Sequence, residues 1–252
     1  MRKRLSLIIV ALVLAASIVT PVFAEGSSEE EVYPSKAADF LIPFGAGGSA
    51  DVLGRAMANA AEKYYGEPIV PVNRVGGGGG VMYQEMVSNG DEYTIGWSST
   101  SILTVTNIGN VEFPYDTLDH VCRIGYTSVP IAVLADSPWQ TFDDFVEYAK
   151  ANPGELIVGN AGTGSLTHLT SIVIATKADI DVVHIPIGAE RRNPALLGGE
   201  IQAIVSPLPE ISPLVDSGDV RILAFPSGSR DKTYSDVPTM QELGYDVVLD
   251  LF

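Results

Sequence analysis

Residues 40–51 read FLIPFGAGGSAD and decide how the first half of the chain folds. Large apolar residues dominate the first five positions, which predicts a buried strand, and the glycines that follow end it. Apolar residues at helical spacing begin near Ala50 and continue to Gly66, which is expected to end that helix. A strand that leads through a glycine-rich turn into a helix is typical of parallel α/β sheets.

The alternation of strands and helices continues after Gly66. Residues 69–72 predict a second strand, glycines 76–80 open a second helix that runs through Met86, and residues 93–97 predict a third strand. This βαβαβ order implies parallel strands joined by right-handed crossovers.

The second half begins differently, because two apolar runs at 121–124 and 129–135 have no helical pattern between them. We interpret them as extended segments that cross between two lobes. A helix with a capping-box pattern then starts at Thr141 and continues to Lys150. Further units follow, with strands at 156–158, 182–185, 201–205 and 221–225 and helices at 166–177, up to 197 and up to 217. The sequence therefore predicts an α/β fold with two lobes, lobe 1 at residues 39–127 and lobe 2 at residues 128–245.

The N-terminal residues 1–24 have the pattern of a secretory signal peptide. Arg2, Lys3 and Arg4 precede an apolar run from Leu5 to Val19, and small residues lead to a cleavage site after Ala24. An uncleaved membrane anchor is the alternative. Residues 25–38 are polar and acidic, and we interpret them as a flexible leader. We expect an exported protein that is periplasmic and soluble after cleavage.

The composition excludes several classes of protein. Fifteen Lys and Arg stand against 31 Asp and Glu, for a formal net charge of -16, which argues against nucleic acid or anionic lipid as a partner. One cysteine, Cys122, excludes an internal disulfide, and its apolar surroundings suggest a small buried residue. Three scattered histidines do not suggest a zinc site. We expect no metal and no cofactor.

Two glycine-rich turns carry the chemistry: the first glycine loop, residues 43–51, and the second glycine loop, residues 159–165. Each lies between a predicted strand and a helix, where main-chain N–H groups have no partner within the helix. A helix start also carries partial positive charge, so each loop is suited to bind an anion. The alternative is that both are only tight connections in which Ser49 and Ser165 cap their helices. Two such loops, one per lobe, favour a shared ligand cleft.

Two enzymatic alternatives remain open. Gly45-x-Gly47-x-x-Ala50 matches a dinucleotide fingerprint, but Val72-Asn73-Arg74 provides no acidic residue for a ribose. An exported serine hydrolase could use Ser165 or Ser49. His168 follows Ser165 by three residues, but the second glycine of a nucleophile elbow is missing. His168 is more simply interpreted as a packing or cleft-lining residue.

Several motifs together resemble one family. They occur in order at residues 41–55, 73–80, 91–94, 162–168, 197–199, 218–221 and 237–244. This set resembles the substrate-binding receptors of the tripartite tricarboxylate transporters, also called Bug proteins. The resemblance implies a hinged, two-lobed periplasmic-binding-protein fold of type II and no enzymatic activity. It also implies capture of a di- or tricarboxylate, or a related organic anion, for a membrane permease. We expect a monomer.

The resemblance also implies which residues bind the ligand. Asp51 would repel a bound carboxylate directly, so we expect it to cap its own helix or to hold a bridging water. The implied binding residues are Phe44, Ala46, Gly47, Gly48, Ser49, Asp51, Ser98, Ser99, Thr100, Gly162, Thr163, Gly164, Ser165 and His168.

The chain departs from the family pattern in two places. Residues 186–189 read PIGA and are followed by Glu190-Arg191-Arg192, where the family is more often neutral. One of these arginines could bind a second ligand carboxylate, or both could form a solvated surface pair. Residues 246–252 would begin the return to lobe 1, and the family pattern continues beyond them. Lobe 1 is therefore expected to lack a strand and to expose a sheet edge.

Overall fold

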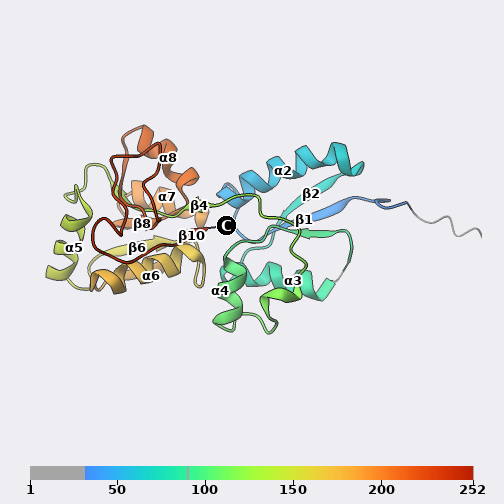
Figure 1. Ribbon diagram of the computed structural model, residues 1–252, viewed down its shortest axis with the longest axis horizontal. Helices are drawn as coiled ribbons and strands as arrows, with labels where there is room; N and C mark the ends of the chain where they lie inside the picture. The colour runs from blue at the N-terminus through green and yellow to red at the C-terminus, as the bar shows by residue number, and fades with distance from the viewer. Residues whose placement is uncertain (1–31, 90, 252) are drawn as a thin grey trace, which may run out of the picture. The chain divides into compact units, whose positions relative to one another are not determined.

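The computed structural model describes residues 32–89 and 91–251 (Figure 1). The predicted signal peptide and the first half of the predicted leader lie outside these residues. Lys36–Phe252 form one compact unit. Within the described part of the chain, no helix is both long enough and apolar enough to cross a membrane.

Lobe 1 is built on a parallel three-stranded sheet. Strand β1 (Ala38–Ile42) lies between β2 (Ile69–Asn73) and β3 (Thr94–Gly96). Helix α2 (Ser49–Tyr65) connects β1 to β2, and it ends at Gly66, whose φ of 87° is left-handed. A 3₁₀ turn, η1 (Gly77–Gly79), and α3 (Gly80–Asn89) connect β2 to β3. The predicted βαβαβ order is confirmed.

Both faces of this sheet are covered by helices (Figure 1). Phe40 and Ile69 pack with Ala58 of α2 on one face. Leu41 packs with residues of α3 and of α4 (Ser101–Asn107) on the other face. Neighbouring residues of β1 serve opposite faces because side chains alternate along a strand. Helix α4 was not predicted from the sequence.

Lobe 2 is built on a five-stranded sheet in the order β7-β6-β8-β5-β9. Only β5 runs antiparallel to its neighbours, so the prediction of a mostly parallel sheet is confirmed. The strands are β5 (Ile131–Leu134), β6 (Ile157–Asn160), β7 (Val183–Pro186), β8 (Ala203–Val205) and β9 (Val220–Ala224).

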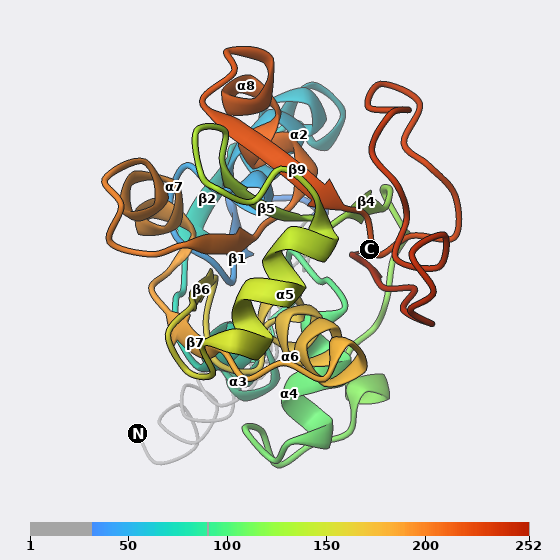
Figure 2. The ribbon, with the colours of Figure 1, turned by 90° about the vertical axis from the view of Figure 1, so that its left-hand side faces the viewer.

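Helices α5 (Phe142–Ala151) and α6 (Leu166–Ala178) pack on one face of this sheet, as Figure 2 shows. Helices α7 (Ala189–Leu197) and α8 (Leu208–Asp216) pack on the other. The capping box predicted at Thr141 is present: its side chain accepts a hydrogen bond from the Asp144 N–H, and the Asp144 carboxylate accepts one from the Thr141 N–H.

The segment between the two sheets differs from its prediction in burial. Residues 121–124 form no strand, and the strand there is the two-residue β4 (Thr127–Ser128), which pairs with β10 (Asp250–Leu251). Val121 is 91% exposed and Cys122 is exposed, so the expectation of a buried Cys122 is wrong. An apolar run becomes a strand only where a neighbouring strand supplies hydrogen bonds, and 121–124 have no such neighbour among the described residues. The lobe boundary at residue 128 stays a prediction.

Candidate ligand-binding site

The first glycine loop leaves the carboxyl end of β1, and Asp51 holds its shape. The Asp51 side chain is buried, and its carboxylate accepts a hydrogen bond from the Gly47 N–H at 3.0 Å. Arg55 Nε and Asn73 Nδ2 donate to the same carboxylate, each at 2.9 Å. Burial raises the pKa of Asp51, but these hydrogen bonds outweigh burial and hold the pKa below its ordinary value. Asp51 therefore stabilises the conformation of the loop. It is not the N-cap residue of α2, which is Gly48.

A carboxylate lies at the start of α2, and it belongs to Glu210 in the first turn of α8. The Ser49 N–H donates to Glu210 Oε1 at 2.8 Å, and Ser49 Oγ donates to the same oxygen at 2.7 Å. The positive end of the helix dipole favours a negative charge at this position. The chain's own carboxylate thus occupies the place where the sequence predicts a ligand anion.

Arg192 of α7 holds the other oxygen of this carboxylate. Its guanidinium is fully buried, and Nη2 donates to Glu210 Oε2 and, at 2.9 Å, to Ser206 Oγ. Burial lowers the pKa of Arg192, and the charge of Glu210 opposes that effect. The interpretation of both arginines as a solvated pair is therefore wrong for Arg192. Arg191 has an exposed side chain, 3.6 Å from Glu200.

The second glycine loop is held mainly by its own side chains. Ser165 caps α6 by accepting a hydrogen bond from the His168 N–H at 3.3 Å. The Gly162 N–H donates to Asn160 Oδ1 at 3.1 Å, and the Gly164 N–H donates to His168 Nδ1 at 3.2 Å. The capping interpretation thus describes Ser165 but not Ser49, which is the first residue of its helix.

Each glycine loop approaches the opposite lobe, but at a different place. Gly45 lies so close to the Glu190 carboxylate that a Cβ there would collide with it. In the second loop, the Gly164 carbonyl accepts a hydrogen bond from Thr104 Oγ1 of α4. A Cβ on Gly78 of η1 would lie 2.6 Å from the Thr163 carbonyl oxygen. Among the described residues, no hydrogen bond joins one glycine loop to the other.

The remaining predicted residues of lobe 1 lie within the first loop or follow β3. The Phe44 carbonyl accepts a hydrogen bond from Asn73, and Ala46 is exposed. Ser98 is exposed and follows β3, at the carboxyl ends of the parallel strands, where the first loop also lies. Ser99 is buried, donates its N–H to Tyr83 Oη at 3.2 Å and shares a hydrogen bond with Ser101. Thr100 lies at the start of α4.

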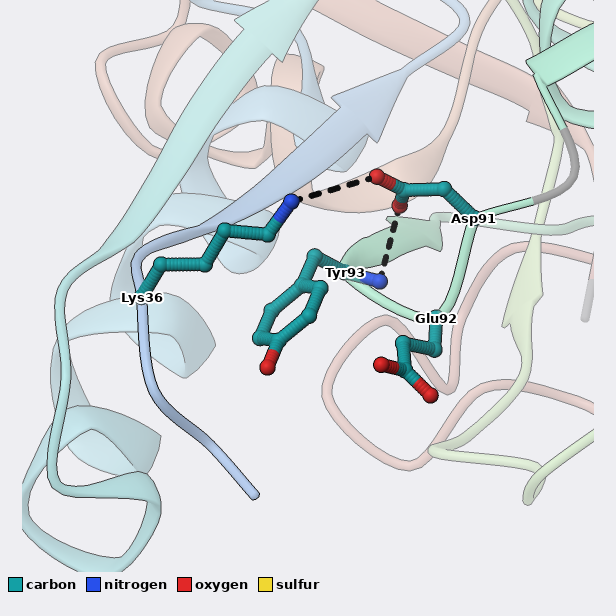
Figure 3. A pocket seen from close by; sticks show the side chains of 4 residues that line it. All are labelled: Lys36, Asp91, Glu92 and Tyr93. Atoms are coloured by element: carbon teal, nitrogen blue, oxygen red, sulfur yellow. Dashed lines mark hydrogen bonds and ion pairs between the residues drawn. The ribbon is translucent and has the colours of Figure 1, made fainter. Parts of the chain in front are cut away.

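A separate surface depression lies at the opposite end of the strands of the first sheet (Figure 3). It is lined by Lys36, which precedes β1, and by Asp91, Glu92 and Tyr93, which precede β3. The Lys36 ammonium lies 3.6 Å from the Asp91 carboxylate and 4.3 Å from the centre of the Tyr93 ring. This depression is therefore at the amino ends of the strands, whereas the glycine loops are at the carboxyl ends.

His168 and His184 form a half-buried pair beneath the second loop. Their ring centres are 5.9 Å apart in an edge-on arrangement, and His184 Nδ1 shares a hydrogen bond of 2.7 Å with Ser171 Oγ. Burial lowers the pKa of both rings, and the nearby His168 lowers that of His184 further.

Three residues of the site were missed by sequence reasoning: Glu210, Ser206 and Thr104. Glu210 and Ser206 follow β8 at its carboxyl end, where parallel sheets usually bind ligands. That position was the available signal, since a serine and an acidic residue flank a predicted strand-to-helix turn. Thr104 gave no signal, because its helix was not predicted.

Two mostly parallel sheets, each flanked by helices and each presenting a glycine loop at the carboxyl end of its first parallel strand, define a periplasmic-type binding protein. Solved structures agree. BugD, a periplasmic binding protein, is 26% identical with a TM-score of 0.81 over 87% of this chain and 75% of that chain. MatC from Rhodopseudomonas palustris, solved with bound malate, shares the fold at 21% identity, with a TM-score of 0.81 over 87% and 76% of the two chains.

The sequence comparison identifies the family. Residues 53–250 match the family described as "Tripartite tricarboxylate transporter family receptor", and the chain belongs to that family. Protein BugT of Bordetella pertussis is 30% identical over 248 residues, which cover 96% of this chain and 74% of BugT. The resemblance seen in the sequence motifs is thereby confirmed.

Proposed function

We propose that this protein is a periplasmic receptor that captures a small di- or tricarboxylate, or a related organic anion, between its lobes. One observation carries the proposal: a carboxylate, that of Glu210, accepts two hydrogen bonds from Ser49 at the start of α2. The start of α2 is thus built to hold a carboxylate group, as expected from unpaired N–H groups and the helix dipole.

Membership of the receptor family supports the remainder of the proposal. The receptor would deliver its ligand to the permease subunits of a tripartite tricarboxylate transporter. Closure of the two lobes on the ligand would bring the contacts of both lobes onto one anion. MatC, which has the same fold, holds malate in its structure.

No observation favours the serine hydrolase or the dinucleotide-dependent enzyme. In the hydrolase alternative His168 would have to accept the proton of Ser165. His168 Nδ1 instead accepts the Gly164 N–H, and Ser165 Oγ accepts the main-chain N–H of His168. No carboxylate pairs with the His168 ring among the residues that the structure describes. The arrangement of Ser165 and His168 therefore lends the hydrolase alternative no support.

Calorimetric titration with malate, citrate, adipate and glutamate tests the proposal, with glucose and the neutral diamide of succinate as controls. At least one anion should bind and raise the melting temperature. At a hundredfold excess of ligand over Kd, the free energy of unfolding should increase by about 2.7 kcal/mol. Binding of a neutral control without binding of any anion would refute the proposal.

A further inference from the structure

Glu210 is held by groups from three separate segments. Ser49 belongs to α2 in lobe 1, Arg192 to α7 and Ser206 to the turn after β8. Two hydrogen bonds from Ser49 reach one carboxylate oxygen, while Arg192 and, at 3.5 Å, Ser206 Oγ reach the other. A carboxylate bound on both oxygens by donors from two lobes has the arrangement of a bound ligand.

Arg192 has more hydrogen-bonding capacity than Glu210 uses. Its side chain is fully buried, yet Nε and Nη1 have no hydrogen-bond partner among the described residues. A buried guanidinium with unpaired N–H groups is costly, because it has lost water without full compensation. An anion with additional acceptor oxygens would satisfy these groups.

The neighbouring arginine shows what an ordinary surface pair looks like in this chain. Arg191 and Glu200 have side chains that are 67% and 65% exposed, and 3.6 Å separate Nη2 from Oε2. The Glu210 side chain is only 10% exposed and receives hydrogen bonds from the opposite lobe. The pair formed by Arg192 and Glu210 is therefore part of the inter-lobe site and not of the solvated surface.

We propose that Ser49, Ser206 and Arg192 form a carboxylate subsite that the chain's own Glu210 fills, so that Glu210 competes with the ligand. A ligand carboxylate must displace Glu210 from the start of α2, and it then gains Arg192 as its counter-charge. The subsite accepts a carboxylate of charge -1. Because Glu210 competes for it, the affinity of the protein for its ligand is lower than it would be with the same donors and no Glu210. This inference deepens the proposed function and rests on it for the ligand class.

Acetate tests the subsite, because it is a free copy of the Glu210 carboxylate. In Glu210→Ala the subsite is vacated, and acetate should bind and raise the melting temperature above that in chloride of equal ionic strength. If Glu210 fills the subsite more than nine-tenths of the time, acetate should bind at least about tenfold more tightly to Glu210→Ala than to the wild type. Neutral acetamide should give no shift.

Two control variants separate this effect from a general response to salt. Glu200→Ala removes the carboxylate of the exposed arginine pair and should respond to acetate as the wild type does. The double variant Arg192→Leu with Glu210→Ala keeps the vacated position but lacks the counter-charge, and its acetate response should disappear. Equal acetate responses of Glu210→Ala and Glu200→Ala would overturn the proposal. An acetate response of the double variant as large as that of Glu210→Ala would overturn it too.

Glu210→Gln provides the test if Glu210→Ala does not fold. Gln keeps the shape of the side chain but not its charge, so acetate should still bind more tightly than to the wild type. An acetate affinity equal to that of the wild type would overturn the proposal. The outcome is also separable from the proposed function: acetate binding to the variants without any anion binding to the wild type would uphold the subsite and refute the receptor.

Discussion

The two glycine loops have similar sequences and similar places in their lobes, but their polar groups are satisfied in different ways. In the second loop, the side chains of Asn160, Ser165 and His168 pair with neighbouring main-chain groups. In the first loop, the start of α2 receives a carboxylate from a residue 161 positions away. The main-chain N–H groups of Gly162 and Gly164, and that of His168 in the first turn of α6, are therefore satisfied within the second loop's own region, whereas the start of α2 takes its partner from the opposite lobe. Changes at the two loops should consequently differ in their effects.

The largest effect is expected from removing the charge that supports the first loop. Arg192→Leu leaves the mostly buried Glu210 carboxylate without its counter-charge, which should cost about 3–5 kcal/mol of stability. Arg191→Leu breaks an exposed pair and should cost no more than about 1 kcal/mol. Urea denaturation of both variants measures the difference. Similar losses would mean that the support of the first loop is no stronger than a surface pair.

A second test concerns the contact between the second loop and η1. Gly78 has a φ of 66°, and a Cβ there would lie 2.6 Å from the Thr163 carbonyl oxygen. Gly78→Ala should therefore cost about 2–3 kcal/mol through backbone strain and steric overlap together.

Gly109 is the matched control, with a φ of 76° and no atom within 4 Å of its Cβ position. Gly109→Ala should cost about 1 kcal/mol from strain alone. Thermal denaturation gives both values. Equal losses of stability in the two variants would mean that the second loop does not pack closely against η1 in solution.

The cap of α6 should contribute less. Ser165→Ala removes the side chain that accepts the His168 N–H, and we expect a loss of about 1 kcal/mol. Hydrogen exchange should accelerate in the first turn of α6 and remain unchanged at the start of α2. Faster exchange at α2 as well would show that the two loops are coupled more closely than their contacts suggest.

The smallest effect is a pH dependence near the second loop. Burial lowers the pKa of His168 and His184 below the ordinary value of 6.5, so the folded state favours the neutral rings. Their contribution to stability is complete above about pH 6.5 and is lost as the pH falls through the lowered pKa values. His184→Gln should flatten this loss, whereas His120→Gln, at an exposed residue, should not. The loss of stability is measured from the midpoints of urea denaturation of each variant between neutral and mildly acidic pH.

Much of the fold could be predicted from the sequence because its signals are local. Gly66 ends α2 because only glycine easily adopts a φ of 87°, and Thr141 begins α5 because it can form a capping box with Asp144. The apolar run at 121–124 was misleading about burial. Its residues suggested a buried Cys122, but burial requires packing partners that sequence spacing does not reveal.

The sequence by itself determined the α/β class, the order of most strands and helices, the two glycine loops and the family to which the chain belongs. These follow from periodicity, from the backbone freedom of glycine and from ordered motifs. Only the tertiary structure decided that Arg192 is buried while Arg191 is exposed, and that Glu210 lies at the start of α2. Neighbouring residues with the same charge differ only in direction on their helix. Which direction meets the other lobe depends on the packing of segments that are far apart in the chain.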